Sequence, residues 1–267
     1  MNQAEKAARF RRLHEGCFVI ANAWDAGSAR ILAGLGFQAL ATSSGAHAGT
    51  LGRRDGQVTR DEALAHARAI VEATDLPVSA DFENCFADEP SPASETIRLA
   101  ADVGLAGCSI EDATRDRVYD FDHAVARVAA AAEAASSMSF PVMLTARAEN
   151  FVRGRPDLDD TIKRLQAFEK AGADVLMAPG LPDLESVRKV CNALSKPFNF
   201  MAGIKGKSFS VAELQSAGVR RISLATSLWR AAMSSLVDAA REVKDKGTFG
   251  YVERSLATAE IVKLMEK

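Results

Sequence analysis

The sequence predicts a single (β/α)8 TIM-barrel domain over residues 1–267, with additional helices at its ends. Eight short apolar segments occur along the chain, and helical sequence fills the gaps between them and follows the last one. Strict alternation of strand and helix is typical of a parallel sheet with right-handed crossovers. Eight such units in 267 residues favour a closed barrel over an open sheet, because no GxGxxG nucleotide loop follows the first strand.

Seven of the eight strands are expected to follow either a glycine or a proline. In four segments a glycine ends a helix and a buried apolar strand follows, at 32–44, 100–112, 169–180 and 215–227. In three others a proline opens the strand, at 76–84, 140–150 and 196–203. Residues 18–25 supply the first strand, and Asp25 and Ser28 are expected to cap the helix after it.

Helices are also expected outside the eight units. Residues 1–16 form a charged amphipathic helix, 228–244 a second, and 248–267 a further helix beyond the minimal barrel. Extra terminal helices often pack on a neighbouring subunit. Residues 228–267 therefore predict a homo-oligomer. Exchange of these helices between subunits is one arrangement that would achieve this.

The composition argues against several classes of partner. A formal net charge of -2 offers no basic surface for nucleic acid. No stretch approaches the about 20 apolar residues of a membrane span, and residues 1–16 lack the apolar core of a secretion signal. The four cysteines, at 17, 85, 108 and 191, form no CxxC pair and fit no zinc pattern. Free thiols in a cytoplasmic protein are expected.

Acidic residues at the predicted strand ends form a candidate metal site. The functional face of such a barrel is the carboxyl end of its strands. Asp81 and Glu83 lie two apart on an extended segment, so both would point to one face, and Glu111 ends the adjacent strand. Three acids at one point repel unless a cation neutralises them, and oxygen ligands alone select Mg²⁺ first and Mn²⁺ second. The alternative is that these acids cap helices or pair with arginines.

Two further features at the strand ends suit an anionic substrate. Arg147 ends the fifth strand, where a guanidinium would bind a carboxylate or phosphonate in a bidentate way. A salt bridge to Glu111 or Glu149 is the alternative. Ser43, Ser44 and Gly45 form a small-residue turn whose backbone N–H groups would face a substrate oxygen, unless it is simply a tight turn.

Other polar residues give weaker signals. His47 lies near the same turn, but a single histidine is more often a packing or surface residue. Lys205 and Lys207 follow the seventh strand and are expected to be solvated. Cys85 lies beside the acids, and since no neighbour activates it, it is expected to be a wall residue.

These residues resemble the isocitrate lyase/phosphoenolpyruvate mutase superfamily nearly end to end. The resemblance rests on NAWDAGSA, ATSSGAHAG followed by LGRRDG, VSADFEN, GCSIEDA and LTARAEN. It implies a barrel with Mg²⁺ and a 2-oxo acid or its enolate in the mouth. The implied metal ligands are Asp81, Glu83 and Glu111. The resemblance also implies that Asp55 lies close to the reacting atoms, that Arg147 holds the substrate carboxylate, and that residues 43–45 supply donors to the substrate. Tetramers with exchanged terminal helices are implied as well.

The loop after the fourth strand departs from both familiar branches of that superfamily. It is DATRDRVYDFD, residues 112–122, without the cysteine and histidine of the KKCGH-type loop in the lyase branch. Arg117 and Tyr119 fall near the lysine and asparagine of the phosphonate mutase branch. Cleavage of isocitrate or methylisocitrate by the cysteine route is therefore not expected, and mutase activity is not favoured. Asn84, Cys85 and Phe86 also replace a glycine-rich continuation.

The resulting hypothesis is a Mg²⁺-dependent lyase or decarboxylase. It would cleave a carbon–carbon bond in a small 2-oxo or 2-hydroxy dicarboxylic acid through a pyruvate-like enolate, with Asp55, Glu111 and Arg147 as catalytic residues. The 112–122 loop is expected to close over the substrate. One alternative is a phosphonopyruvate hydrolase or phosphonomutase that acts on a C–P bond. Another is a non-catalytic barrel that binds a metabolite. A class II aldolase-like site would require histidine metal ligands, which are missing.

Overall fold

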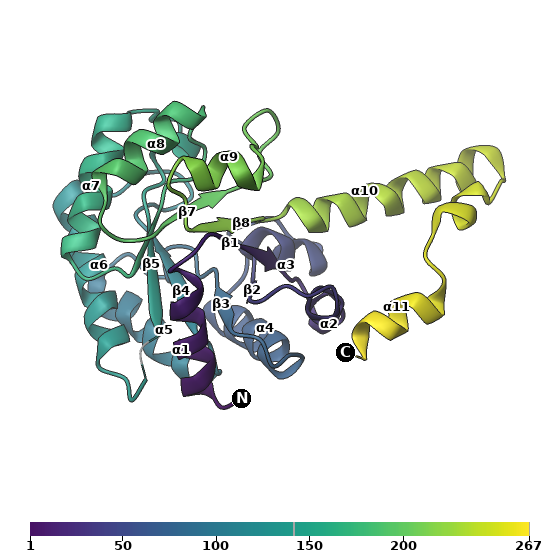
Figure 1. Cartoon of the computed structure of the whole chain (residues 1–267), viewed down its shortest axis with the longest axis horizontal. Coiled ribbons are helices and arrows are strands. Elements are labelled where there is room, and N and C mark those ends of the chain that lie inside the picture. The colour runs from purple at the N-terminus through teal and green to yellow at the C-terminus, as the bar shows by residue number, and fades with distance from the viewer. Residues whose placement is uncertain (141, 267) are drawn as a thin grey trace.

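Eight parallel strands close into a barrel in chain order, with β1 hydrogen-bonded to β8 (Figure 1). The computed structural model describes residues 1–140 and 142–266. This closure confirms the predicted fold class. Pro141, which was expected to open the fifth strand, lies outside the described residues. The strands are β1 (Phe18–Asn22), β2 (Leu40–Ala41), β3 (Val78–Ala80), β4 (Gly107–Glu111), β5 (Met143–Arg147), β6 (Val175–Met177), β7 (Phe198–Met201) and β8 (Arg221–Ser223).

Helices surround the barrel and connect successive strands (Figure 1). Asp25 caps the first of them, α2, because its carboxylate accepts from the Ser28 backbone N–H at 2.6 Å while the Ser28 hydroxyl accepts from the Asp25 backbone N–H. The capping role expected for both residues is confirmed. The connecting helices are α2 (Ala26–Gly34), α3 (Ser44–Thr50), α4 (Arg60–Glu72), α5 (Pro90–Asp102), α6 (Phe121–Ser136), α7 (Leu158–Lys170), α8 (Leu184–Ala193) and α9 (Val211–Ser216).

The amino end of the barrel is closed by the N-terminal helix α1 (Gln3–Leu13). Phe10 of α1 is fully buried and packs in a small apolar cluster with Met143. Arg221 lies inside the barrel nearby and donates to Asn199 Oδ1 and Thr145 Oγ1, each at 2.8 Å. This end is filled by packed side chains, so the open end of the barrel is the carboxyl end of its strands.

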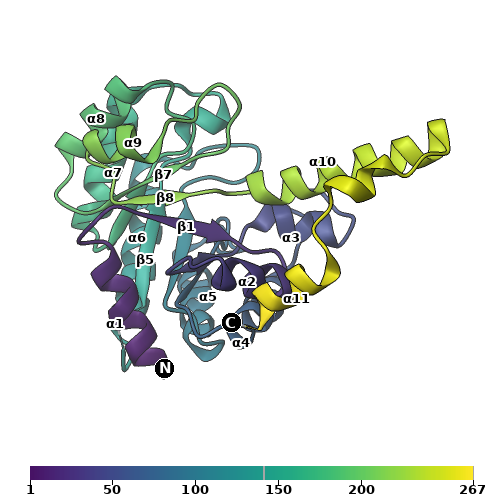
Figure 2. The ribbon, with the colours of Figure 1, turned by 45° about the vertical axis from the view of Figure 1, so that its right-hand side comes forward.

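The C-terminal segment leaves the barrel and then returns to it. Helix α10 (Ser227–Arg241) projects away, a π-helical turn (Glu242–Lys246) and a 3-10 turn (Gly250–Arg254) follow, and α11 (Thr258–Met265) completes the segment (Figures 1 and 2). Helices were correctly predicted in this region, but the predicted bounds of the last helix were wrong. The last helix begins at Thr258, not at residue 248, because Gly247 takes a left-handed φ of 64° and the Glu242 side chain accepts from Thr248 Oγ1 at 2.9 Å, which stabilises a turn there. Lys267 lies outside the described residues.

Two glycines allow this segment to approach the barrel closely. A Cβ on Gly49 of α3 would lie 2.4 Å from the Trp229 indole, so glycine is needed where α10 starts. A Cβ on Gly34 of α2 would lie 1.9 Å from the Leu264 carbonyl oxygen of α11. Between these two contacts α10 has no buried residue, and Leu236 is 60% exposed. In the described part of the chain, no helix has the length and apolarity that crossing a membrane requires.

Candidate active site

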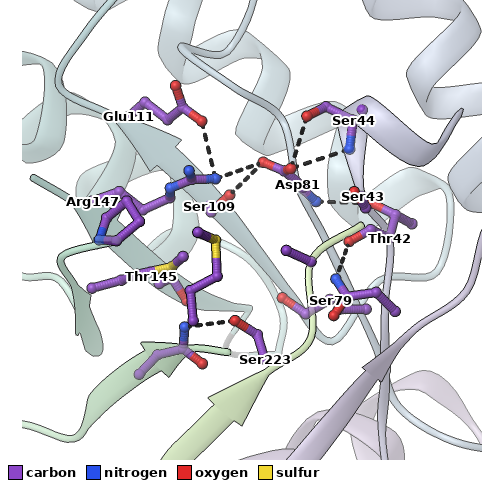
Figure 3. Close-up of a pocket in the computed structure, with 18 of the residues that line it drawn as sticks. Thr42, Ser43, Ser44, Ser79, Asp81, Ser109, Glu111, Thr145, Arg147 and Ser223 are labelled. Carbon is purple, nitrogen blue, oxygen red and sulfur yellow. Dashed lines mark hydrogen bonds and ion pairs between the residues drawn. The ribbon is translucent and has the colours of Figure 1, made fainter. Parts of the chain in front are cut away.

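A cavity of about 280 Å³ occupies the open end of the barrel, and the predicted site residues converge on it. Asp81 follows β3, Glu111 ends β4 and Arg147 ends β5, so three neighbouring strands contribute one charged side chain each. Figure 3 shows the Arg147 guanidinium between Glu111 and Asp81. Asp55 and residues 43–45 line the same cavity. All the predicted site residues except Glu83 therefore line this cavity, and Glu83 lines a neighbouring cavity together with Ser44, Asp55 and Glu111.

Arg147 is the centre of the charge network. Its Nη1 atom lies 3.0 Å from Asp81 Oδ1 and 3.0 Å from Glu111 Oε1, and its Nε lies 2.9 Å from Glu149 Oε1. Burial alone would lower the pKa of Arg147, but these three carboxylates raise it above its ordinary value. The salt bridges to Glu111 and Glu149 that the sequence offered as an alternative are present, and Arg147 also lines the cavity. Its binding of a substrate carboxylate stays a prediction.

The turn after β2 supports Asp81. Ser43 caps α3, and its hydroxyl accepts from the Ala46 backbone N–H at 3.3 Å. The backbone N–H and hydroxyl of Ser44 both donate to Asp81 Oδ2, at 3.1 and 2.9 Å. These two hydrogen bonds from Ser44 fix the orientation of Asp81. Ser43 and Ser44 also line the cavity.

Glu83 differs from the sequence expectation in its backbone. Strand β3 ends at Ala80, and Glu83 has a left-handed φ of 50°, so the two-residue strand periodicity does not extend from Asp81 to Glu83. Its backbone carbonyl accepts from the Glu111 N–H at 2.8 Å, which keeps the residue beside β4. Its carboxylate faces a cavity of about 470 Å³ that also borders Asp55 and Glu111.

The carboxylates raise one another's pKa values. Burial, followed by the charges of Asp81 and Asp55, raises the pKa of Glu83 to about 7. Burial and then the charge of Asp81 raise the pKa of Asp55. Burial raises the pKa of Glu111 well above its usual range, even though Arg147 opposes the effect. Burial is the largest cause at all three residues, and the carboxylates of the site outnumber the arginines that pair with them.

A divalent cation fits this excess of carboxylate oxygens. Glu83 Oε1 is buried and has no hydrogen-bond partner among the described residues. In the same residues, no three histidine, cysteine, aspartate or glutamate side chains lie close enough to enclose a metal ion. A bound Mg²⁺ would therefore take one direct carboxylate ligand and contact the others through water.

Sequence reasoning missed Arg153 and named Glu149 only as a salt-bridge partner of Arg147. Glu149 is 1% exposed and binds Arg147. Arg153 donates from Nη2 to Glu111 Oε2 at 3.1 Å. Arg153 lies in a 3-10 turn (Asn150–Arg153), six residues beyond the end of β5, where the strand-end rule gives no signal. The signal for Arg153 in the sequence was the charged segment ENFVR, residues 149–153, which follows the strand.

A group of arginines borders the neighbouring cavity of about 470 Å³. This cavity adjoins the first one, since Ser44, Asp55, Glu111 and Arg153 line both. Arg54 and Arg115 line it as well. The Arg115 Nη1 donates to the Asp55 backbone carbonyl at 3.3 Å, and the Nε of Arg153 is buried without a partner among the described residues. The space beside the carboxylates can therefore accept a second anionic group.

The loop from β4 to α6 is tied to its surroundings. Asp112 accepts from Arg164 Nη1 at 3.2 Å and from the Glu149 N–H at 2.8 Å, which fixes the start of the loop. At the other end the Tyr119 hydroxyl donates to Asp88 Oδ1 at 2.5 Å and accepts from Asn84 Nδ2 at 3.0 Å. Between these anchors the loop carries Arg115 over the cavity.

Cys85 is fully buried behind the acids. Burial raises the pKa of its thiol to about 12, so the reactive thiolate form is disfavoured. Its φ of 58° is a left-handed value that side chains rarely adopt, so the residue shapes the loop after Glu83. The expectation that Cys85 is a wall residue agrees with this environment.

Comparison with known proteins adds a family likeness. The sequence model of the family described as phosphoenolpyruvate phosphomutase matches residues 10–244. A crystal structure of a candidate lyase/mutase from Burkholderia cenocepacia J2315 is 46% identical and has a TM-score of 0.96, covering 99% of this chain and 97% of that one. A candidate phosphonomutase from the same organism is 35% identical, with a TM-score of 0.85 and coverage of 90% and 99%. Among curated sequences, the 2,3-dimethylmalate lyase of Eubacterium barkeri is 27% identical over 276 residues, which cover 97% of this chain and 93% of the relative.

Proposed function

Because this chain belongs to the phosphoenolpyruvate phosphomutase family of the isocitrate lyase/phosphoenolpyruvate mutase superfamily, we propose that it is a Mg²⁺-dependent lyase or decarboxylase. It would cleave a carbon–carbon bond in a small 2-oxo or 2-hydroxy dicarboxylic acid. The observation that carries the proposal is the contact of one buried arginine, Arg147, with two carboxylates from neighbouring strands, Asp81 and Glu111, at the open end of the barrel.

The cation would be held by the acidic residues that the sequence singled out. Asp81 is the direct ligand best supported, because Ser44 fixes its orientation, and Glu83 and Glu111 would act through water. Mn²⁺ would serve as a substitute. When bound, the cation would stabilise negative charge that develops on the substrate oxygen.

The chain's own residues would orient the substrate and manage one proton. Arg147 would bind the carboxylate next to the 2-oxo group. In a 2-oxo dicarboxylic acid the C3–C4 bond then breaks, CO₂ leaves, and the electron pair of the bond forms the enolate of a pyruvate-like product. Asp55 would deliver a proton to C3, directly or through a water, since its raised pKa favours the protonated form. In a 2-hydroxy acid the ionised form of Asp55 would take the hydroxyl proton as the C2–C3 bond breaks, which leaves a 2-oxo acid. The electron pair of that bond would go to C3, as the enolate of the second carboxylate, and a proton from Asp55 would then complete the second product.

The second cavity supports a dicarboxylic substrate over a monocarboxylic one. Arg54, Arg115 and Arg153 border it beside the reacting end of the site. Once a cation neutralises the carboxylates, these guanidinium groups would leave the cavity positively charged. A second carboxylate on the substrate would be attracted there, and the loop at 112–122 would cover it.

Action on a C–P bond is the second candidate function. The same arginines suit a phosphonate, and a phosphonomutase-like relative is 35% identical to this chain. A non-catalytic metabolite-binding barrel is a further alternative.

One experiment separates the three functions. The protein is incubated with Mg²⁺ and, in turn, oxaloacetate, alkylmalates and phosphonopyruvate, and pyruvate release is measured. The proposal expects pyruvate from an oxo or alkylated dicarboxylic acid and its loss in Asp81→Ala. Pyruvate from phosphonopyruvate alone would favour C–P hydrolysis, and its conversion to the isomer phosphoenolpyruvate would favour a phosphonomutase. No turnover, together with unchanged ligand binding in Asp81→Ala, would reject both enzyme functions.

We also propose that the protein is a homo-oligomer, with a tetramer expected from the family resemblance, in which residues 228–267 pack on a neighbouring copy. Helix α10 supports this, because it has no buried residue and projects from the barrel (Figure 2). Exposed apolar side chains continue along the segment, at Leu236, Phe249 and Val252. A second copy of this chain would cover that surface.

We further propose a cytoplasmic location. Cys17, Cys85, Cys108 and Cys191 are all free thiols, and a reducing compartment keeps thiols in that state. The proposed partner is a small-molecule 2-oxo acid, with no nucleic acid or membrane partner.

A further inference from the structure

His47 is a buried histidine whose ring lacks a well-aligned hydrogen bond in the part of the chain that the structure describes. It lies on α3, is 9% exposed, and stacks on His66 of α4 with ring centroids 3.8 Å apart and an angle of 12° between the rings. His66 has an evident role, since its Nε2 lies 2.9 Å from the Trp24 carbonyl oxygen. Neither ring nitrogen of His47 makes a well-aligned hydrogen bond among the described residues, although the Glu62 backbone carbonyl lies near the ring.

Such an arrangement is costly unless something else satisfies the ring. A neutral imidazole carries one N–H donor and one acceptor nitrogen. A buried polar group left without a hydrogen bond costs about 1–3 kcal/mol. Packing against His66 satisfies neither nitrogen of His47, because a stacked ring offers no hydrogen bond in the ring plane.

A second atom without a partner lies at the same place. Oε1 of Glu83 is also buried with no partner among the described residues. Both His47 and Glu83 line one small cavity of about 10 Å³. The other polar residues that line it are Thr42, Ser43, Ser44, His66 and Asp81. A polar cavity of roughly 10–15 Å³ is the size that holds a single water.

We propose that one buried water bridges the His47 imidazole to Glu83 Oε1, and that His47 is thereby a positioning residue for the carboxylate cluster. The imidazole N–H donates to the water, and the water donates to the carboxylate oxygen. This inference rests on the proposed function, because it assigns Glu83 to a divalent cation site.

Glu83 has particular need of such support. Its left-handed backbone places it outside the strand, so the sheet does not set the direction of its side chain. Outer partners that orient metal ligands typically contribute about 10–100-fold to metal affinity. His47 would supply that orientation from outside the substrate cavity, since it does not line that cavity.

The consequence for metal binding is tested on the metal-free protein with Mn²⁺, by counting free ions in electron paramagnetic resonance. His47→Phe keeps the stacking ring and removes both nitrogens, so Mn²⁺ affinity should fall about 10–100-fold. His47→Gln retains a donor and an acceptor and should recover most of that affinity. His66→Phe is the matched control, because it removes the bond to Trp24 and should lower the melting temperature without weakening Mn²⁺ binding.

Wild-type affinity in His47→Phe, or an equal loss in both phenylalanine variants, would overturn the positioning role. The bridge itself is tested by a crystal structure of the wild-type protein at high resolution. Density for a water within hydrogen-bond distance of His47 and Glu83 supports it, and a dry cavity overturns it. The crystal structure separates the water bridge from the proposed metal function. A wild-type protein that holds the water but binds no Mn²⁺ would reject only the metal function.

Discussion

Arg147 binds three carboxylates from one side chain, and this makes it the residue on which the site depends most. Changing it to glutamine leaves Asp81, Glu111 and Glu149 without their shared cation. Removing one member of a buried charge pair costs about 2–5 kcal/mol, so kcat/KM for pyruvate release should fall at least about 30-fold. Arg147→Lys should recover only part of the loss, because an ammonium cannot present the separate Nη1 and Nε donors.

Thermal melting of both variants shows whether the fold is retained. Full activity in folded Arg147→Gln would contradict the assignment of this residue to the substrate carboxylate.

Glu83 makes the stability of the metal-free protein depend on pH. Its folded pKa of about 7 lies above the ordinary value of 4.5, so the folded state binds the proton more tightly than the unfolded state. The free energy of unfolding should therefore fall as the pH rises from about 4.5 to 7 and change little above that range. Glu83→Gln should remove this contribution and stabilise the metal-free protein at pH 8 by about 1–3 kcal/mol.

Urea unfolding of both proteins at pH 5, 6, 7 and 8 measures the effect. Parallel pH profiles for the wild type and the variant would mean that the pKa of Glu83 is not raised in the folded protein. Saturating Mn²⁺ should reduce the difference, since a bound cation stabilises the ionised form.

Single residues show where sequence reasoning stops. Asp81, Glu111 and Arg147 could be placed from the sequence, because each directly follows or ends a buried apolar run. Glu83 could be selected but not oriented, since a left-handed backbone at a glutamate leaves no pattern. Arg153 could not be selected, because its position depends on how the turn after β5 folds back over Glu111.

Among the elements, the loop between β4 and α6 determines how the substrate enters. Tyr119 fastens this loop to the β3–α5 loop through its hydroxyl. Tyr119→Phe removes two hydrogen bonds, each worth about 1 kcal/mol, so residues 112–120 should exchange amide hydrogen faster and substrate KM should rise up to about tenfold. Hydrogen exchange with mass spectrometry and steady-state kinetics measure the two effects.

Tyr251 provides the control for that substitution. It is the only other tyrosine of the chain and lies in the 3-10 turn near the C-terminus. Tyr251→Phe should leave both readouts at the wild-type level. Unchanged exchange in Tyr119→Phe would mean that the loop is held by other contacts.

At the scale of the whole molecule, the barrel could be predicted because eight alternations of strand and helix leave little topological freedom. The extent of the C-terminal helices could not, since their sequence is amphipathic and α10 has no buried residue among those described. Helix α10 ends at Arg241 and α11 begins at Thr258 because of local turns between them. Those turns depend on Gly247 and on one glutamate side chain, Glu242.

The proposed assembly predicts a change in size on disrupting α10. Leu236→Asp places a charge on its exposed apolar surface and should reduce the molar mass measured by light scattering after gel filtration. Val211→Asp is the matched control, because Val211 is 47% exposed on α9, away from the C-terminal segment. A wild-type protein that is already monomeric at micromolar concentration would reject the assembly.

The exposed helix α10 would also make the stability of the fold depend on protein concentration. A contact that exists only between folded copies shifts the folding equilibrium by mass action. Dilution would then weaken the fold itself, and the melting temperature should rise with protein concentration. Such an enzyme would be least stable at low concentration, so its abundance in the cell would influence its lifetime.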